Sequence, residues 1–241
     1  QAVQEIEEGN LSKVVLSRKI AIPIEINPLE VFQRMASTYR NAFCYLFSHP
    51  QLGTWMGATP EQLIKFNHHQ FETVSLAGTQ RKADFKTWTA KEIQEQQFVT
   101  DYILDSLHKD VQSLKVTPPE TVEAGSLVHL KTMITGEVFS SKNSLQLVKN
   151  LHPTPAVCGL PKEAALSFIR SHEGYDREFY TGYVGLWNAS SDRNLFVNLR
   201  CMKVAPLEVT LYVGCGITKD SNPEAEFFET EHKSMTMRNI L

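Results

Sequence analysis

Residues 195–216 read LFVNLRCMKVAPLEVTLYVGCG, and this stretch decides the fold class. Two runs rich in apolar and β-branched residues flank an Ala-Pro corner, which is a strong turn signal. A third such run precedes them, so the pattern predicts an antiparallel meander. Its expected strands are Gly182–Trp187, Leu195–Val204 and Glu208–Val213, joined by the turns Ala189–Arg193 and Ala205-Pro206.

A second β-rich stretch and several helices lie on the amino-terminal side of this meander or flank it. The expected strands are Val14–Ile24, Ala42–Phe47, Thr54–Ala58 and the hairpin Gln62–Phe66 with Phe71–Leu76. Apolar residues at spacings of three and four predict a long helix over Trp88–Leu114, carried by Val99, Ile103, Leu107, Val111 and Leu114. Further helices are expected over Pro161–His172 and from Pro223, with Asn222 as the cap. The pattern indicates an α+β fold in one domain, residues 1–241.

Composition excludes several classes of function. The 241 residues are 42% apolar and carry 24 Lys+Arg against 27 Asp+Glu, without a run of like charges, so neither nucleic acid nor a membrane is an expected partner. Four widely spaced cysteines form no C-x-x-C pair, so neither a zinc ribbon nor a redox dithiol is indicated, and a reducing cytoplasm is expected. No segment resembles a signal peptide or a membrane span. Because the sequence begins with Gln1, we expect it to be part of a longer protein.

Two pairs of carboxylates have the spacing E-x-x-E. Glu92 and Glu95 continue the apolar stripe of the long helix, and Glu226 and Glu229 precede Lys233 on the last helix. Two such helices facing one cavity would offer the hard oxygen ligands that Mg²⁺ selects.

Two other interpretations compete with this magnesium site. Each pair, taken alone, is more often a solvated helix face. The segment Glu229-Thr-Glu-His232 also has the E-x-x-H spacing of di-iron bundles, but the second E-x-x-H that such a site needs is missing, because Glu92 is followed by Glu95 and Glu95 by Phe98.

Glycines and isolated polar residues are further candidates. Ala77-Gly78-Thr79 and Gly214-Cys215-Gly216 are expected to be turns after strands, where backbone N–H groups can approach an anion. Lys13, Glu61, His129 and Arg200 stand at strand-rich positions. Each alone is more often a structural residue, but a lysine and a glutamate in one pocket could act as base and acid, and an arginine could bind a carboxylate. No motif supports a hydrolase or a zinc peptidase. These residues predict a magnesium site for a small carboxylated substrate.

The sequence resembles the chorismate-utilising enzymes, which comprise isochorismate synthases, salicylate synthases and the large components of anthranilate and aminodeoxychorismate synthases. The resemblance spans nearly the whole chain. It rests on the segments Lys13–Arg18, Gly57–Glu61, Leu76–Thr79, His152–Ala156, Tyr175–Glu178, Asn198–Cys201, Gly214–Ile217 and Glu226-x-x-Glu229. It implies large, mostly antiparallel sheets sandwiched with helices, as in the anthranilate synthase large component. Complete members carry an additional amino-terminal portion that contributes strands to this sandwich.

The resemblance also implies a role for each site residue. Lys13 matches the base that activates water, and Glu61 matches the acid that protonates the departing 4-hydroxyl of chorismate. Glu95 and Glu229 match the Mg²⁺ ligands, with Glu92 and Glu226 beside them. The remaining matches are substrate contacts, namely Gly78, Thr79, His129, Arg200, Gly214, Gly216 and Lys233.

Two positions discriminate within the family. Water-using members resemble this chain in having a lysine at position 13, and the nucleophilic lysine of aminodeoxychorismate synthases is replaced here by Ala77. These positions favour an isochorismate synthase of menaquinone or siderophore biosynthesis. Salicylate synthase, an ammonia-using synthase and a chorismate-binding module without turnover are the alternatives. No glutaminase subunit is expected, and we expect a monomer or a weak dimer.

Overall fold

The computed structural model describes residues 1–124, 127–140, 143–188 and 192–241, and the chain divides into two compact units. Unit 1 contains Gln1–Glu61, Pro153–Val184 and Phe196–Leu241. Unit 2 contains Gln62–His152 and Gly185–Leu195. The single domain expected over residues 1–241 stays a prediction. In the described part of the chain, no helix is both long and apolar enough to cross a membrane.

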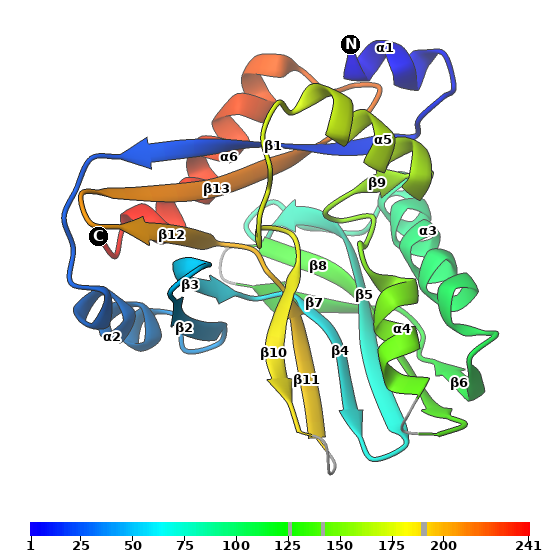
Figure 1. Cartoon of the computed structure of the whole chain (residues 1–241). Coiled ribbons are helices and arrows are strands. Elements are labelled where there is room, and N and C mark those ends of the chain that lie inside the picture. Colours follow the sequence, from blue (N-terminus) through cyan, green and yellow to red (C-terminus); the bar gives the residue numbers. More distant parts are fainter. Residues whose placement is uncertain (125–126, 141–142, 189–191) are drawn as a thin grey trace. The chain divides into compact units, whose positions relative to one another are not determined.

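Unit 1 is built on a six-stranded sheet of order β2-β3-β12-β13-β1-β9, in which neighbouring strands are antiparallel (Figure 1). Its long central pair is β1 with β13, in a register that places Val15 opposite Gly216 and Ser17 opposite Gly214. The strands are β1 (Lys13–Ile22), β2 (Phe43–His49), β3 (Gly53–Thr59), β9 (Gly159–Leu160), β12 (Cys201–Ala205) and β13 (Glu208–Ile217).

The two faces of this sheet have different coverings because neighbouring residues of a strand point to opposite sides. Met202 and Leu211 pack in a core with residues of α2 and α6, whereas Cys201 and Tyr212 join an aromatic cluster that includes Trp55. The helices of unit 1 are α1 (Ala2–Glu7), α2 (Pro28–Thr38), α5 (Lys162–His172) and α6 (Pro223–Arg238). The Asn222 side chain caps α6, as the sequence predicts.

Unit 2 contains most of a seven-stranded sheet of order β10-β11-β4-β5-β8-β6, with β7 also paired to β8. Helix α3 packs on β5 and β8, where the Gln96 amide donates to the Ser75 carbonyl (3.0 Å) and to Thr132 (3.1 Å). The elements are β4 (Gln62–Asn67), β5 (Gln70–Arg81), α3 (Ala90–Leu107), β6 (Val111–Val116), β7 (Glu120–Ala124), β8 (Leu127–Val138), α4 (Ser144–Leu151), β10 (Tyr183–Trp187) and β11 (Asp192–Val197). Helices combined with antiparallel sheets confirm the predicted α+β class.

The predicted strand Leu195–Val204 is wrong, because the structure breaks it into β11 and β12, which belong to different sheets. Asn198 and Arg200 lie at the break, and Arg200 has a φ of 48°, a left-handed conformation that ends an extended run. The Asn198 side chain is held by Tyr45 and by the Phe179 carbonyl. The hairpins β10-β11 and β12-β13 do form, so the predicted local pairing is confirmed, but the predicted three-stranded meander is wrong because the two hairpins lie in different sheets. Of the turn expected at Ala189–Arg193, residues 189–191 lie outside the described residues.

Both glycine-rich turns are also wrong. Gly214 and Gly216 lie inside β13, opposite Ser17 and Val15. Gly78 lies inside β5 with a φ of 69°, where the register with β8 shifts between Ala77 and Thr79, as in a β-bulge. The alternation of apolar and polar residues along a strand does not show whether a glycine ends the strand. A glycine inside a strand can instead leave room for a side chain from another segment.

The long helix was predicted beyond its end. Helix α3 ends at Leu107, and Val111 and Leu114 belong to β6. Ile103 and Leu107 are buried as expected, and the buried face continues towards the amino terminus through Gln96 and Thr100. The helical spacing of apolar residues continues past Leu107 because Val111, four residues later, is also apolar and buried, although it belongs to a strand.

Candidate active site

Unit 1 contains a small cavity of about 80 Å³. Small-molecule sites usually measure several hundred Å³. This hollow is smaller, so it has room for one end of a substrate, such as a carboxylate, and not for a whole molecule. It lies over the paired strands β1 and β13 and beside the Arg200 break. The lining residues are Val15, Ala156, Val157, Tyr180, Leu199, Arg200, Tyr212, Val213, Gly214, Cys215, Gly216 and Lys233.

Lys13 begins β1, and its side chain lies across Gly216. A Cβ built on Gly216 would come within 2.8 Å of the Lys13 Cε and 3.4 Å of its Nζ. Glycine at position 216 therefore leaves room for the lysine stem, which is a different role from the turn that the sequence predicts. In the same way, a Cβ on Gly214 would lie 2.9 Å from the Tyr180 hydroxyl.

Glu61 lies among three cationic side chains of unit 1. Burial raises the pKa of its carboxyl group, and Lys13, Lys233 and Arg200 act in the opposite direction without cancelling that effect. A carboxyl group with a raised pKa keeps its proton to a higher pH, which is what a general acid needs. The main chain around it is fixed, because its carbonyl accepts from Val197 N–H at 2.9 Å.

Arg200 and Lys233 form the cationic side of the cavity. Burial lowers the pKa of Arg200, opposed by Tyr180, Glu229 and Glu61. The Lys233 ammonium donates to the Gly214 carbonyl (3.0 Å) and pairs with Glu229 (2.5 Å). Both cations can therefore contact an anion that enters this hollow.

The backbone of β13 adds donors to the same place. Val15 N–H donates to the Cys158 carbonyl and Ser17 N–H to Glu173, so both point away from β13. In an antiparallel ladder the residues opposite them, Gly216 and Gly214, then turn their N–H groups away from β1 as well. Strand β12 pairs with β13 only as far as Tyr212, so among the described residues no strand covers this edge of β13 beyond it.

Two of the four predicted carboxylate ligands, Glu226 and Glu229, lie on helix α6 of unit 1. Glu226 accepts from the Ser221 hydroxyl (2.7 Å), and Glu229 is exposed apart from its pair with Lys233. Their oxygens are of the kind that Mg²⁺ selects, so α6 fits this ion chemically. Among the residues that the structure describes, no three carboxylate, imidazole or thiol groups gather at one point to hold a metal.

The carboxylates of α3 have different surroundings. Glu92 is the third residue of the helix and forms a capping box with Thr89, while both of its oxygens accept from the Gln80 amide at 2.8 Å. Its carboxylate is therefore already satisfied by local structure, which the spacing did not reveal. Glu95, one turn further, is exposed. The structure brings Glu92 beside Gly78, since a Cβ on that glycine would lie 3.3 Å from the Glu92 Cβ.

His129 also lies beside Gly78. It stands opposite Thr79 in the β5-β8 ladder, where the bulge occurs. Burial lowers the pKa of the imidazole, and a hydrogen bond with the Gly78 backbone opposes this. Unit 2 thus brings Gly78, Glu92 and His129 together; the side chain of Thr79 lies outside what the structure describes.

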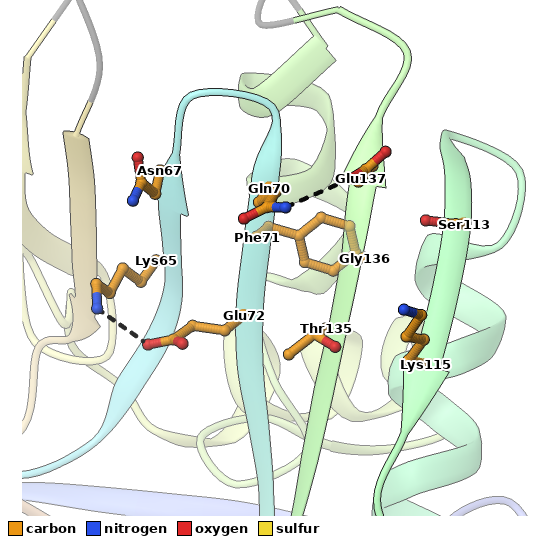
Figure 2. A pocket seen from close by; sticks show the side chains of 10 residues that line it. All are labelled: Lys65, Asn67, Gln70, Phe71, Glu72, Ser113, Lys115, Thr135, Gly136 and Glu137. Atoms are coloured by element: carbon orange, nitrogen blue, oxygen red, sulfur yellow. Dashed lines mark hydrogen bonds and ion pairs between the residues drawn. The ribbon is translucent and has the colours of Figure 1, made fainter.

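A larger hollow of about 370 Å³ lies on the sheet of unit 2 and contains none of the predicted site residues (Figure 2). Lys65 pairs with Glu72 at 3.3 Å across it, and Gln70 lies 3.5 Å from Glu137. Mixed charges in ion pairs on an open sheet face are typical of solvated surface. We therefore place the candidate site at the smaller cavity.

Sequence reasoning missed part of the cavity wall. Tyr180 and Tyr212 lie in the wall beside Gly214, but an aromatic residue alone gives no signal of this position. Cys215 also lines the cavity, and burial raises the pKa of its thiol to about 11, so it remains a protonated thiol rather than a nucleophile. The four cysteines are free.

The chain belongs to the family of chorismate binding enzymes, whose match covers residues 1–241. The family predicted from the sequence motifs is therefore confirmed. Among its relatives are isochorismate synthases.

Two curated relatives illustrate the match. The chain is 33% identical to the isochorismate synthase DhbC of Bacillus subtilis over 98% of its own length and 65% of that protein. It is 32% identical to the isochorismate synthase MenF of Escherichia coli over 100% of its length and 58% of that protein. The chain thus spans less than two thirds of either relative.

Solved structures agree with this assignment. The menaquinone-specific isochorismate synthase MenF of Escherichia coli matches the whole chain with a TM-score of 0.88 at 29% identity, and the chain covers 58% of it. Anthranilate synthase component I of Streptococcus pneumoniae also has a TM-score of 0.88 but is 23% identical, which shows the shared fold.

Proposed function

We propose that the full-length protein is an isochorismate synthase, which converts chorismate to isochorismate. The observation that carries this proposal is the position of Glu61, a carboxyl group with a raised pKa, among Lys13, Arg200 and Lys233. The named activity of the relatives supports it. Menaquinone or siderophore biosynthesis and a cytoplasmic location belong to the same proposal. One relative is named as menaquinone-specific and another as vibriobactin-specific.

Lys13 and Glu61 carry the proton transfers. For this step Lys13 first gives up its own proton, and its amine then takes a proton from water as the water oxygen forms a bond to C2 of the ring. The double bond shifts, the C4–O bond breaks, and Glu61 gives its proton to the departing hydroxyl group. Addition of one water and loss of another leave the atomic composition unchanged, so the reaction is an isomerisation.

Arg200, Lys233 and the N–H groups of Gly214 and Gly216 bind a substrate carboxylate. The guanidinium and the ammonium supply charge, and the uncovered edge of β13 supplies directed donors. A cavity of about 80 Å³ suits this end of the molecule. Gly78, Thr79 and His129 are proposed as further substrate contacts.

We propose Glu95 and Glu229 as Mg²⁺ ligands, with Glu226 and Glu92 acting beside them. When bound, the ion supplies positive charge for the ring carboxylate of chorismate. Glu92 is the weakest candidate of the four because the helix start and Gln80 already use its oxygens. The reaction as written needs no ammonia, so no glutaminase subunit is part of the proposal.

Product identification tests the function. Full-length protein is incubated with chorismate and Mg²⁺, with and without ammonium salts, and the products are separated by chromatography and identified by mass. We expect isochorismate, with loss of conversion in a chelator. Salicylate or an aminated product would contradict the proposal in favour of a related synthase, and chorismate binding in calorimetry without any product would indicate a binding module.

A further inference from the structure

The edge of strand β1 is covered by an unusually short partner. Strand β9 consists of Gly159–Leu160 and pairs with Lys13 and Val14 only, after which Val15 N–H reaches the Cys158 carbonyl. Beyond this point the Val15 carbonyl and the Ser17 N–H lie on the same edge, and no strand from the described residues pairs with them. Backbone groups at such an edge need other partners.

A buried ion pair supplies those partners. The Arg177 guanidinium donates to the Val15 carbonyl at 2.7 Å, and Glu173 accepts from Ser17 N–H at 2.8 Å and from the Ser17 hydroxyl at 2.9 Å. Arg177 also donates two hydrogen bonds to the Glu173 carboxylate. One comes from Nε, 2.7 Å from Oε2, and the other from the terminal nitrogen Nη2 to Oε1. The side chains of Arg177 and Glu173 are 14% and 3% exposed.

Arg177 also holds the opposite wall of the cavity. Its second terminal nitrogen donates to the Val157 carbonyl at 2.9 Å. Val15 and Val157 both line the cavity, and Lys13 lies two residues before Val15 on the same strand. One planar guanidinium therefore fixes the distance between the strand that carries the base and the turn that faces it.

We propose that Arg177, oriented by Glu173, is a positioning residue that holds Lys13 and the Ala156–Val157 wall in register for the reaction. The inference rests on the proposed function. The fork geometry is essential to it, because a lysine ammonium carries charge but cannot span two backbone carbonyls and a carboxylate in one plane. Small displacements of a reacting group cost rate far more than they cost binding.

The test uses Arg177→Lys in the full-length protein. We expect kcat to fall by about 10- to 100-fold with a much smaller change in KM, since Lys13 is displaced while Arg200 and Lys233 still bind substrate. Arg170→Lys is the matched control, because Arg170 is an exposed arginine of α5. Ile169→Val, in the core that α5 shares with β1, controls for stability and should lower the melting temperature with kcat unchanged.

A second readout does not depend on turnover. Lys13 is acylated with a small amine-reactive reagent at several pH values. Peptide mass spectrometry follows the rate of acylation, with the exposed Lys149 as the internal reference. We expect Arg177→Lys to change the Lys13 rate several-fold and the Lys149 rate not at all. If Arg177→Lys is recovered unfolded, Glu173→Gln takes its place, because it keeps acceptors for Ser17 but removes the charge that orients Arg177.

The outcomes separate the two proposals. Unchanged Lys13 acylation together with kcat within twofold of the parent overturns the inference and leaves the function standing. A loss of kcat no larger than that of an equally destabilised Ile169→Val protein also overturns it. A parent protein without activity on chorismate, in which Lys13 acylation still responds to Arg177→Lys, refutes the function and supports the positioning role.

Discussion

Helices α6 and α3 carry the same E-x-x-E spacing but use it differently. In α6 the helix begins at Pro223 and Asn222 caps it, which leaves both Glu226 and Glu229 available for a ligand beyond their local bonds. In α3 the helix begins at Ala90, so Glu92 is its third residue and completes a capping box. A shift of one position relative to the helix start thus gives Glu92 a structural role in the helix cap in addition to its proposed place beside the metal. Spacing alone therefore predicts a face of a helix but not what the face is used for.

The largest effect is expected at Lys13, the proposed base in unit 1. Lys13→Ala should lower kcat by about 10²- to 10⁴-fold while chorismate still binds, because only the proton acceptor is lost. Steady-state kinetics and calorimetry measure the two quantities. Lys19→Ala, on the same strand, is the control and should retain most of the activity. Turnover of Lys13→Ala at the parental rate would show that the assigned role is wrong.

Glu61→Gln should lower kcat by about 10²-fold or more, since the amide cannot donate the proton. Its pH dependence is the sharper test. In the proposed mechanism Glu61 acts in its protonated form, and its pKa is raised, so the parental kcat/KM should fall as the pH rises through that pKa. The residual activity of Glu61→Gln should lack this alkaline decline. The same decline in both proteins would assign it to another group.

A paired substitution tests the difference between α6 and α3. Glu229→Gln should raise the Mg²⁺ concentration needed for half-maximal activity by about 10-fold or more, because a charged ligand is lost. Glu92→Gln keeps an acceptor for the capping box and should have a smaller effect on both Mg²⁺ dependence and melting temperature. Titration of activity with Mg²⁺ measures the first quantity. An equal increase in the required Mg²⁺ concentration for both variants would indicate that Glu92 contributes as much to Mg²⁺ binding as Glu229.

Alanine substitutions at two glycines, one in each unit, should differ in their effect on the free energy of unfolding. A Cβ on Gly136 of β8 would lie 2.2 Å from the Ser113 carbonyl oxygen, so Gly136→Ala should destabilise the protein by about 1–3 kcal/mol. A Cβ on Gly216 would meet the flexible end of Lys13, so Gly216→Ala should mainly lower kcat. Denaturant unfolding and kinetics give the two values. A larger stability loss for Gly216→Ala would reverse the comparison.

The smallest effect concerns Glu178, which accepts from Tyr212 and Lys203. Burial alone would raise its pKa, but the hydrogen bonds from Lys203 and Tyr212 and the charges of Lys203 and Lys19 hold it below the ordinary value. The stability it contributes is present above the unfolded pKa and is lost as the pH falls through the lowered pKa. Because Glu178 is exposed and solvent screens its ion pairs, Glu178→Gln should cost only about 0.5–1 kcal/mol near neutral pH and less in acid, which thermal unfolding at two pH values measures.

Part of the site was readable from sequence for local reasons. The cap at Asn222 and the strands flanking Lys13 and Glu61 follow from side-chain chemistry and alternation over a few residues. The break at Arg200 was not readable, because it depends on contacts of Asn198 with Tyr45 and Phe179 from distant segments. The end of α3 was missed because the apolar spacing continues unchanged into β6.

The sequence by itself determined the fold class and the family, since periodicity and ordered motifs are properties of the chain alone. Only the tertiary structure decided that Gly216 lies under Lys13, that Gly214 admits Tyr180, and that Arg177 joins Val15 to Val157. These are approaches of a few ångströms between residues far apart in the chain. They are set by strand register and packing, which no local pattern of residues contains.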